Sequence, residues 1–391
     1  MPPKLPKKPL SFAYYFIKQF KWPILLMIFL EAGQAGSQIL LPYAIKEIID
    51  VVTSSPQGLS QEIVIASLRH PMGLFILLSL GVLFFSRASG ALLIWVGPSL
   101  RRLSRYNIYS YLQYHSHRFF TTNFSGSLSN RINEVSVGIN HSLWTVMFDF
   151  WPVVITFSVS MYLVARTNLE LALYLGTWIF LYVGVSFLLA TKARKYARSF
   201  AAARSQVSGK VVDSVTNILN TKMFARKDFE RNFLKNYLDL EVKKGRETLW
   251  FMEKMRWFQF IASLILQVGI MYLAVEHWVT NKITLGDFTM VTSLSLLIIS
   301  DARGLSRRFL EFFEYVGNIA DGVGIMMGEH EIIDAPDAGP LQVRKAEIEF
   351  DNVCFNYAEG KDVFKNLNIK IHSQEKVGLV GFSGSGKTTF V

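Results

Sequence analysis

The residues best suited to chemistry form one glycine-rich run, Gly381-Phe-Ser-Gly-Ser-Gly-Lys-Thr-Thr389. Its spacing is Gly-x4-Gly-Lys-Thr, and it follows a short apolar segment, Lys376–Val380, that predicts a buried strand. The glycines let successive N–H groups point into one concavity that suits phosphate oxygens. Lys387 supplies a cation for the outer phosphates, and the Thr388 hydroxyl is placed to ligate Mg²⁺. We therefore predict a nucleotide phosphate site at Gly381, Ser383, Gly384, Ser385, Gly386, Lys387, Thr388 and Thr389.

Strand patterns precede this run. Three segments alternate polar and apolar residues or are rich in apolar ones: Ala346–Phe350, Val353–Tyr357 and Leu367–Ile371. A linker with two prolines, Asp334–Pro340, precedes them. The pattern predicts that residues 346–391 begin an α/β P-loop domain, after a linker over residues 331–345.

The rest of the chain has the composition of a membrane protein. It is 51% hydrophobic and only 18% charged, which is a low charged fraction for a soluble domain. A bilayer core of about 30 Å needs roughly 20 apolar residues in a helix. A sixth span begins near Phe288, after five clear ones, and it crosses only if Asp301 or Arg303 is shielded in the bundle or faces water. The five clear stretches are Pro23–Tyr43, Pro71–Gly97, Leu143–Val164, Leu169–Ala190 and Phe258–Val279.

Basic residues fall in blocks between these spans, high and low in alternation. The positive-inside rule then puts both termini in the cytoplasm, with three short turns outside. This distribution favours a bilayer over a nucleic acid as the partner of the +11 net charge. The single cysteine, Cys354, excludes a disulfide within one chain and is expected to be a small buried residue.

The two long basic segments, residues 101–142 and 191–257, are predicted to be helices that continue out of the membrane. The second contains no proline and is rich in Ala, Lys, Arg and Leu. At 1.5 Å per residue, the two hairpins would reach roughly 30 and 45 Å from the bilayer. Residues 1–330 are therefore predicted to be an all-α, six-helix transmembrane domain with long intracellular extensions.

Charged residues inside spans are candidates for function. Asp301 and Arg303 lie toward the inner leaflet and are candidates for a translocation path, although either could instead pair with another helix. Arg87 is expected to pair with Asp149, and Glu31 is a weaker candidate.

The motifs together resemble those of ABC exporters in which six spans precede one nucleotide-binding domain. The resemblance covers the whole chain. It is carried by the phosphate run, by Phe355-Asn-Tyr357, by Phe119–Arg131 with its Gly-x-Leu-x-x-Arg ending, and by Val212–Phe224. It implies that Tyr357 stacks on adenine, although an ordinary strand tyrosine is the alternative. It also implies short coupling helices near Phe119–Asn123 and Ser214–Lys222.

The resemblance further implies a half-transporter that uses ATP and Mg²⁺ and works as a homodimer or heterodimer. Such a protein would export a small amphipathic or hydrophobic substrate by alternating access, here in a bacterial inner membrane. Family motifs that would follow the phosphate run, including the catalytic carboxylate, are missing from the sequence up to Val391. We therefore expect a fragment of a longer product that is not an active ATPase alone. The alternative is a truncated, non-catalytic membrane subunit that assembles with or inhibits a full-length partner. A channel or secondary transporter is disfavoured because it leaves Lys387 unexplained.

Overall fold

A computed structural model describes the chain except for residues 1–4, 55–60, 124, 336, 344–345 and 358–361. It divides into two compact units, Met1–Ile332 and Ile333–Val391. The first unit is helical throughout its regular elements, and the second contains a small sheet.

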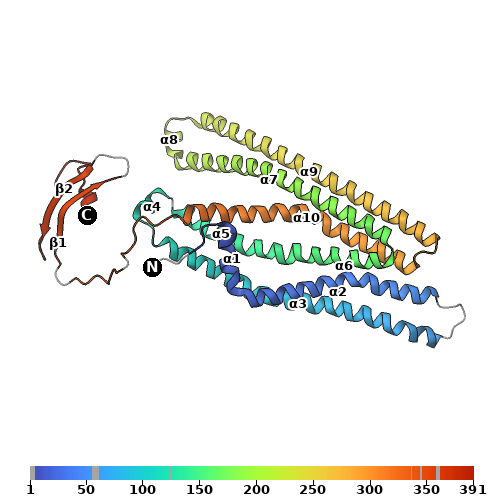
Figure 1. Ribbon diagram of the computed structural model, residues 1–391. Helices are drawn as coiled ribbons and strands as arrows, with labels where there is room; N and C mark the ends of the chain where they lie inside the picture. Colours follow the sequence, from blue (N-terminus) through green and yellow to red (C-terminus); the bar gives the residue numbers. More distant parts are fainter. Residues whose placement is uncertain (1–4, 55–60, 124, 336, 344–345, 358–361) are drawn as a thin grey trace. The chain divides into compact units, whose positions relative to one another are not determined.

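Long helices dominate the first unit (Figure 1). A short helix α1 (Pro9–Ile17) and a single 3₁₀ turn η1 (Lys18–Phe20) lead into the first of them. Two further one-turn or two-turn helices, α4 (His117–Thr122) and α8 (Ile218–Met223), interrupt the path between long helices. The long helices are α2 (Lys21–Ser54), α3 (Gln61–Leu112), α5 (Ser125–Trp144), α6 (Trp151–Thr167), α7 (Leu169–Thr216), α9 (Lys227–Val279) and α10 (Leu285–Met326).

Six helical segments among the described residues are long and apolar enough to cross a membrane. They contain the six predicted spans, and α5 and α6 act as one segment through a π-helical stretch η2 (Thr145–Phe150). The predicted extensions are also confirmed, because α3, α7 and α9 run on without a break past the apolar stretches. We call the end of the bundle with α4 and α8 the hairpin end, and the opposite end, with Asn168 and Thr284, the turn end.

The sixth span is confirmed as part of one continuous helix. Thr284 caps α10: its hydroxyl accepts from the Asp287 N–H, while the Asp287 carboxylate accepts from the Thr284 N–H. Such a reciprocal capping box satisfies two donors that a helix start leaves open. Because α10 contacts α2, α5, α7 and α9, it is the central helix of the unit.

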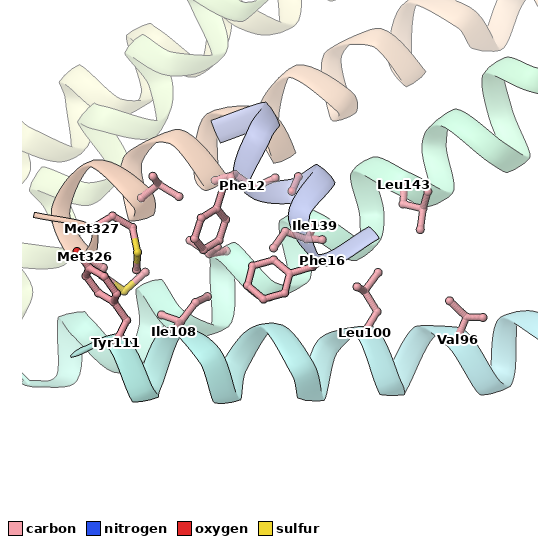
Figure 2. Packing of buried hydrophobic residues seen from close by; sticks show 14 of the residues in the cluster. Phe12, Phe16, Val96, Leu100, Ile108, Tyr111, Ile139, Leu143, Met326 and Met327 are labelled. Atoms are coloured by element: carbon pink, nitrogen blue, oxygen red, sulfur yellow. The ribbon is translucent and has the colours of Figure 1, made fainter. Parts of the chain in front are cut away.

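Two apolar cores lie at different heights of the bundle. The first joins α1, α3, α5 and the end of α10; in Figure 2, Phe12 and Phe16 of α1 lie among Ile108, Ile139 and Met326. The second joins α2, α6, α7, α9 and α10, with Leu171, Leu266 and Leu294 fully buried at its centre. The hairpin end and the membrane-spanning part therefore each have a packed interior.

The second unit has two antiparallel strands, β1 (Ile348–Asn356) and β2 (Asp362–Ile371), with Phe350 opposite Ile369. A one-turn helix α11 (Lys387–Phe390) follows the glycine run. The predicted strand Lys376–Val380 is wrong: these residues have no regular structure, and Val380 is 97% exposed. A strand forms only against hydrogen-bonding neighbours, and none flanks this segment within the described residues. Cys354 is exposed, not buried as expected, because no layer covers its face of β1 there.

Candidate functional site

The glycine run forms a tight backbone loop. Gly384 and Gly386 have φ values of +83° and +89°, a region that residues with a Cβ rarely adopt. Space is also restricted, because a Cβ on Gly386 would lie 2.8 Å from the Val363 side chain of β2. The two glycines allow the turn that starts α11 at Lys387. The local sequence therefore supplies the backbone conformations that the loop needs.

Lys387 belongs to this loop, and Tyr357, which follows β1, contacts it. The Lys387 ammonium donates hydrogen bonds to the carbonyl oxygens of Gly381 and Phe382, each at 2.7 Å. The Tyr357 hydroxyl is 3.1 Å from the Thr389 hydroxyl, although 32 residues separate them. Phe390 stacks on Phe350 of β1 at 4.7 Å between ring centroids, which ties α11 to the sheet. The structure thus brings Tyr357 to the phosphate loop, and its ring remains 59% exposed.

In the membrane-spanning part, Arg303 lines a groove of about 590 Å³ between α9 and α10. Its guanidinium lies over the Phe260 ring, 4.1 Å from the centroid, a cation–π contact. Four of the eight lining side chains are apolar, and four are polar. The lining residues are Phe260, Ser263, Leu264, Gln267, Leu296, Ile299, Ser300 and Arg303.

Asp301 does not share this groove. Its carboxylate lies close enough to Thr156 of α6 and to Arg308 of α10 to interact with both. Arg308 also holds Asp149: its Nε lies 3.2 Å from the Asp149 carboxylate, and its terminal nitrogen donates to the Asp149 carbonyl. The predicted Arg87–Asp149 pair is therefore wrong, since Arg87 bonds instead to Ser86.

Sequence alone could have suggested a basic partner for Asp301. Asp301 and Arg308 are seven residues apart in one helix and so lie on the same face. That spacing could have indicated a basic residue near the Asp301 carboxylate. Glu31, the weaker candidate, is buried in α2 and only 4% exposed.

The turn end of the bundle holds a cluster of charges that the sequence analysis missed. The Lys46 ammonium lies 3.1 Å from Asp50 and 3.6 Å from Asp287, with Glu47 at 3.3 Å. The Asp50 carboxylate also accepts the Gly286 N–H at 3.1 Å. We call Lys46, Glu47, Asp50, Gly286 and Asp287 the turn-end ion cluster. It joins α2 to the start of α10, and only the i, i+4 spacing of Lys46 and Asp50 signals it.

At the hairpin end, the segment after α10 folds back on α3 and α4. Tyr111 donates to the Gly328 carbonyl at 2.8 Å, and a ring nitrogen of His330 lies 3.1 Å from the Tyr111 carbonyl. His115 is within 2.9 Å of the Met326 carbonyl, and its ring centroid lies 4.6 Å from that of His330. We call Lys7, Tyr111, His115, Ser116, Arg118 and residues 326–331 together the hairpin-end clasp.

Charged side chains complete the hairpin-end clasp. Ser116 donates to the Glu331 carboxylate at 2.5 Å, and Arg118 of α4 lies 4.0 Å from that carboxylate. On the N-terminal side, Lys7 pairs with Glu329 at 2.8 Å. Burial, and to a smaller degree the neighbouring His330, lowers the pKa of His115 below its ordinary value. Nothing in the local sequence pattern marked these two histidines, because 215 positions separate them.

The predicted coupling segments, Phe119–Asn123 and Ser214–Lys222, overlap the two short helices α4 and α8, and the second also includes the end of α7. Around α8 the surface is apolar and exposed: Leu219, Met223 and Phe224 are 66%, 71% and 74% exposed. Exposed apolar patches of this kind on a helical tip are typical of contact surfaces.

Comparison with known proteins places these features in a family. The family described as ABC transporter transmembrane region matches residues 24–301. An uncharacterized ABC transporter ATP-binding protein of Haemophilus influenzae is 25% identical over the whole chain, which spans 63% of that relative. A putative multidrug export ATP-binding/permease protein of Staphylococcus aureus is 25% identical over 96% of the chain and 65% of its own length.

A third relative is the mitochondrial iron-sulfur clusters transporter ABCB7 of Rattus norvegicus, 28% identical over 80% of the chain and 42% of its own length. Among solved structures, a bacterial Atm1-family ABC exporter with ATP bound has a TM-score of 0.76 at 20% identity. That match covers 95% of this chain and 65% of the other, and it shows the fold. The chain spans less than two thirds of these relatives' lengths, and it belongs to the ABC transporter transmembrane region family.

Proposed function

We propose that this chain supplies the six spans and the first part of the nucleotide-binding domain of an ATP-driven exporter. In this proposal residues 1–330 are the transmembrane domain and residues 331–345 are the linker. Residues 346–391 begin the ATPase domain. Both termini lie in the cytoplasm, and the protein works as a dimer of two half-transporters. The phosphate loop carried by a six-span chain is the observation that supports this function best.

The loop fits a nucleoside triphosphate. Its two left-handed glycines turn the backbone as an anion-binding concavity requires, and Lys387 already lies over the loop carbonyls. In the proposal Lys387 neutralises the outer phosphates, the exposed Thr388 hydroxyl ligates Mg²⁺, and Tyr357 stacks on the base. Hydrolysis of bound ATP would supply the free energy for transport. Gly381, Ser383, Gly384, Ser385, Gly386 and Thr389 would line the phosphates.

The two hairpins would carry motion from nucleotide to spans. The α8 tip is exposed and apolar, which suits a contact with a nucleotide-binding domain of the second subunit. Since α7 and α9 run from this tip into the spans without a break, a push at α8 would reach the membrane directly. We assign α4 the corresponding role on the first hairpin.

The groove between α9 and α10 suggests the class of substrate. Its apolar wall suits a hydrophobic part, and Arg303 suits an anionic group beside it. An amphipathic substrate with a carboxylate or phosphate fits both features. The rat relative is named for iron-sulfur clusters and the staphylococcal one for multidrug export, and the groove chemistry suits an anionic cargo. Asp301, engaged with Thr156 and Arg308, would shape the path without touching the cargo.

The test uses the full gene product reconstituted in liposomes. We expect Mg²⁺-dependent ATP hydrolysis that Lys387→Ala reduces at least tenfold, because the loop cation is lost. Lys376→Ala, a cation just before the loop, should hydrolyse ATP at the wild-type rate. Equal activity of wild type and Lys387→Ala would overturn the proposal. A gene product that ends at Val391 and lacks ATPase activity would favour the non-catalytic subunit instead.

The groove is tested separately. Arg303→Gln should raise the concentration of an anionic amphiphile needed to stimulate hydrolysis, while basal hydrolysis stays unchanged. The control is Arg256→Gln, since Arg256 lies on α9 outside the groove and pairs with Glu253. Equal responses of the two variants would show that the groove does not bind the cargo.

A further inference from the structure

The segment around η1 faces α3 with an excess of positive charge. The sequence contains no Asp or Glu from Leu5 to Leu30, nor from Ile63 to Leu112. Lys18 and Lys21 lie on or beside η1, and Arg102 lies on α3. In the part of the chain that the structure describes, none of these three cations forms an ion pair. The described residues therefore leave these three cations free to attract an anionic ligand.

A cavity of about 270 Å³ lies between Phe20 of η1 and α3, and Arg102 is the cation that lines it. Its walls are the rings of Phe20 and Tyr106 and the side chain of Leu103, and its polar groups are Arg102 and Ser99. An apolar pocket with an unpaired guanidinium at its edge suits a ligand with both a hydrocarbon part and an anionic group.

The cavity also lies at the membrane boundary. The first apolar run begins at Pro23, and the second ends at Gly97, so both flank the cavity. Trp22 and Trp95 are 71% and 61% exposed there, as expected for indoles at the level of lipid headgroups. The Trp95 ring meets Phe20 edge-on, at 6.5 Å between centroids.

Helix α1 keeps η1 in this place. Phe12 and Phe16 are fully buried against α3 and α10, as Figure 2 shows, while Tyr14 on the opposite face is 62% exposed. A short amphipathic helix pinned on one side and exposed on the other is typical of an interfacial segment. Helix α1 therefore anchors η1 beside the α3 residues that line the cavity.

We propose that this cavity binds one anionic phospholipid from the leaflet that η1 contacts. The Arg102 guanidinium holds the phosphate through charge-assisted hydrogen bonds, with Lys18 and Lys21 adding to the attraction. Phe20 and Leu103 contact the first carbons of the acyl chains, and Tyr106 covers the headgroup side. This site is separate from the Arg303 groove and does not depend on the proposed transport activity.

The experiment is native mass spectrometry of the full gene product in detergent, titrated with phosphatidylglycerol or with phosphatidylcholine of the same acyl chains. We expect the first phosphatidylglycerol to bind at least fivefold more tightly than phosphatidylcholine. Arg102→Gln should remove this preference, and Arg102→Lys should keep part of it because the charge remains but the planar fork is lost. Arg102 is exposed, so these variants should fold, which gel filtration checks.

The matched control is Arg166→Gln. Arg166 is also an exposed arginine beside a tyrosine, Tyr162, but it lies at the turn end. Wild-type lipid preference in Arg166→Gln with loss in Arg102→Gln supports the site. Equal preference in wild type and Arg102→Gln, or equal loss in both variants, overturns it. Displacement of the lipid by glycerol phosphate, which lacks chains, at equal concentration would show a phosphate site and overturn the lipid assignment.

Discussion

At the turn end, α2 and α10 are joined by one lysine and three carboxylates. At the hairpin end, α3, α4 and the segment after α10 meet through two histidines and hydrogen bonds to backbone carbonyls, with more exposed charged contacts at Glu329 and Glu331. The Lys46 side chain is 18% exposed, and its partners Asp50 and Asp287 are 24% and 15% exposed. In the clasp, Tyr111, His115 and Ser116 contact backbone carbonyls or one carboxylate. Both ends close a gap between helices that are far apart in sequence.

The two ends should differ in how their stability responds to pH and to salt. Histidine is the side chain whose ordinary pKa lies between pH 5 and 8, so only the hairpin-end clasp should change over that range. The stability that a partly buried ion cluster contributes changes little with pH near neutrality or with added salt. The predictions below, made for the full gene product in detergent, test this contrast.

The largest effect is expected at the turn end from Lys46→Met. Three partly buried carboxylates lose their cation, which should lower the free energy of unfolding by about 3 kcal/mol. Thermal unfolding followed by tryptophan fluorescence measures the change. Lys210→Met, which removes a cation from an exposed pair with Asp213, is the control and should unfold at the wild-type temperature. A matching loss in both variants would contradict the special role of the cluster.

Gly286→Ala should have the next largest effect. A Cβ at this position would lie 2.4 Å from the Asp50 carboxylate and 2.6 Å from the Lys46 carbonyl. Overpacking against backbone should cost about 2 kcal/mol. Gly36→Ala in α2 places its Cβ in open space and should be neutral or stabilising, since alanine favours helix. If Gly286→Ala unfolds at no lower temperature than Gly36→Ala, α2 and α10 have room for a methyl group at this position.

At the hairpin end, Tyr111→Phe removes the hydrogen bond to the Gly328 carbonyl and should cost about 1 kcal/mol. The exposed Tyr109→Phe on the same helix is the control and should cost nothing measurable. Hydrogen exchange of residues 326–332 should rise in Tyr111→Phe alone. Unchanged exchange would show that the clasp is held by its other contacts.

A pH effect should follow from His115. Because burial lowers its pKa in the folded state, the unfolded chain binds the proton first as pH falls below about 6.5. The stability that neutral His115 contributes is therefore present above that pH and is lost as pH falls toward the folded-state pKa. The facing groups are His330, Glu331 and the Met326 carbonyl, and Glu331 opposes the loss. His115→Gln should unfold with a weaker pH dependence between pH 7 and 5.5; the same dependence as wild type would contradict this assignment.

The smallest effect is expected from Lys7→Met. The Lys7–Glu329 pair lowers the pKa of Glu329, but both side chains are exposed, at 59% and 89%. Surface pairs of this kind contribute little. The unfolding temperature of Lys7→Met at pH 7 should equal that of the wild type within error. A large loss would mean that the N-terminal segment contributes to the clasp through more than this contact.

The sequence predicted what depends on composition and local order. Span positions follow from apolar run length, and the helical extensions follow from residue types between them. The loop at Gly381–Thr389 follows from glycine conformations that are local. These features need no knowledge of which helices are neighbours.

Contacts between distant segments could not be predicted in the same way. Asp149 was assigned to Arg87, but partner choice depends on the rotation of each helix, and α10 presents Arg308 instead. The clasp joins His115 to a segment more than two hundred residues later. The strand at Lys376–Val380 failed for a related reason, because its hydrogen bonds require neighbours that its own residues do not specify.

The unbroken length of α9 has a mechanical consequence. Its 53 residues measure about 80 Å at 1.5 Å per residue. A rod of that length that tilts by about 5° about one end displaces its other end by about 7 Å, more than one helical turn of 5.4 Å. A small rotation at α8 would therefore be multiplied into a full-turn displacement at Val279, with no bend needed along the way. In the proposed exporter, α9 would act as a lever arm whose displacement grows with its number of residues, so inserting whole turns near its middle should lengthen the displacement in proportion.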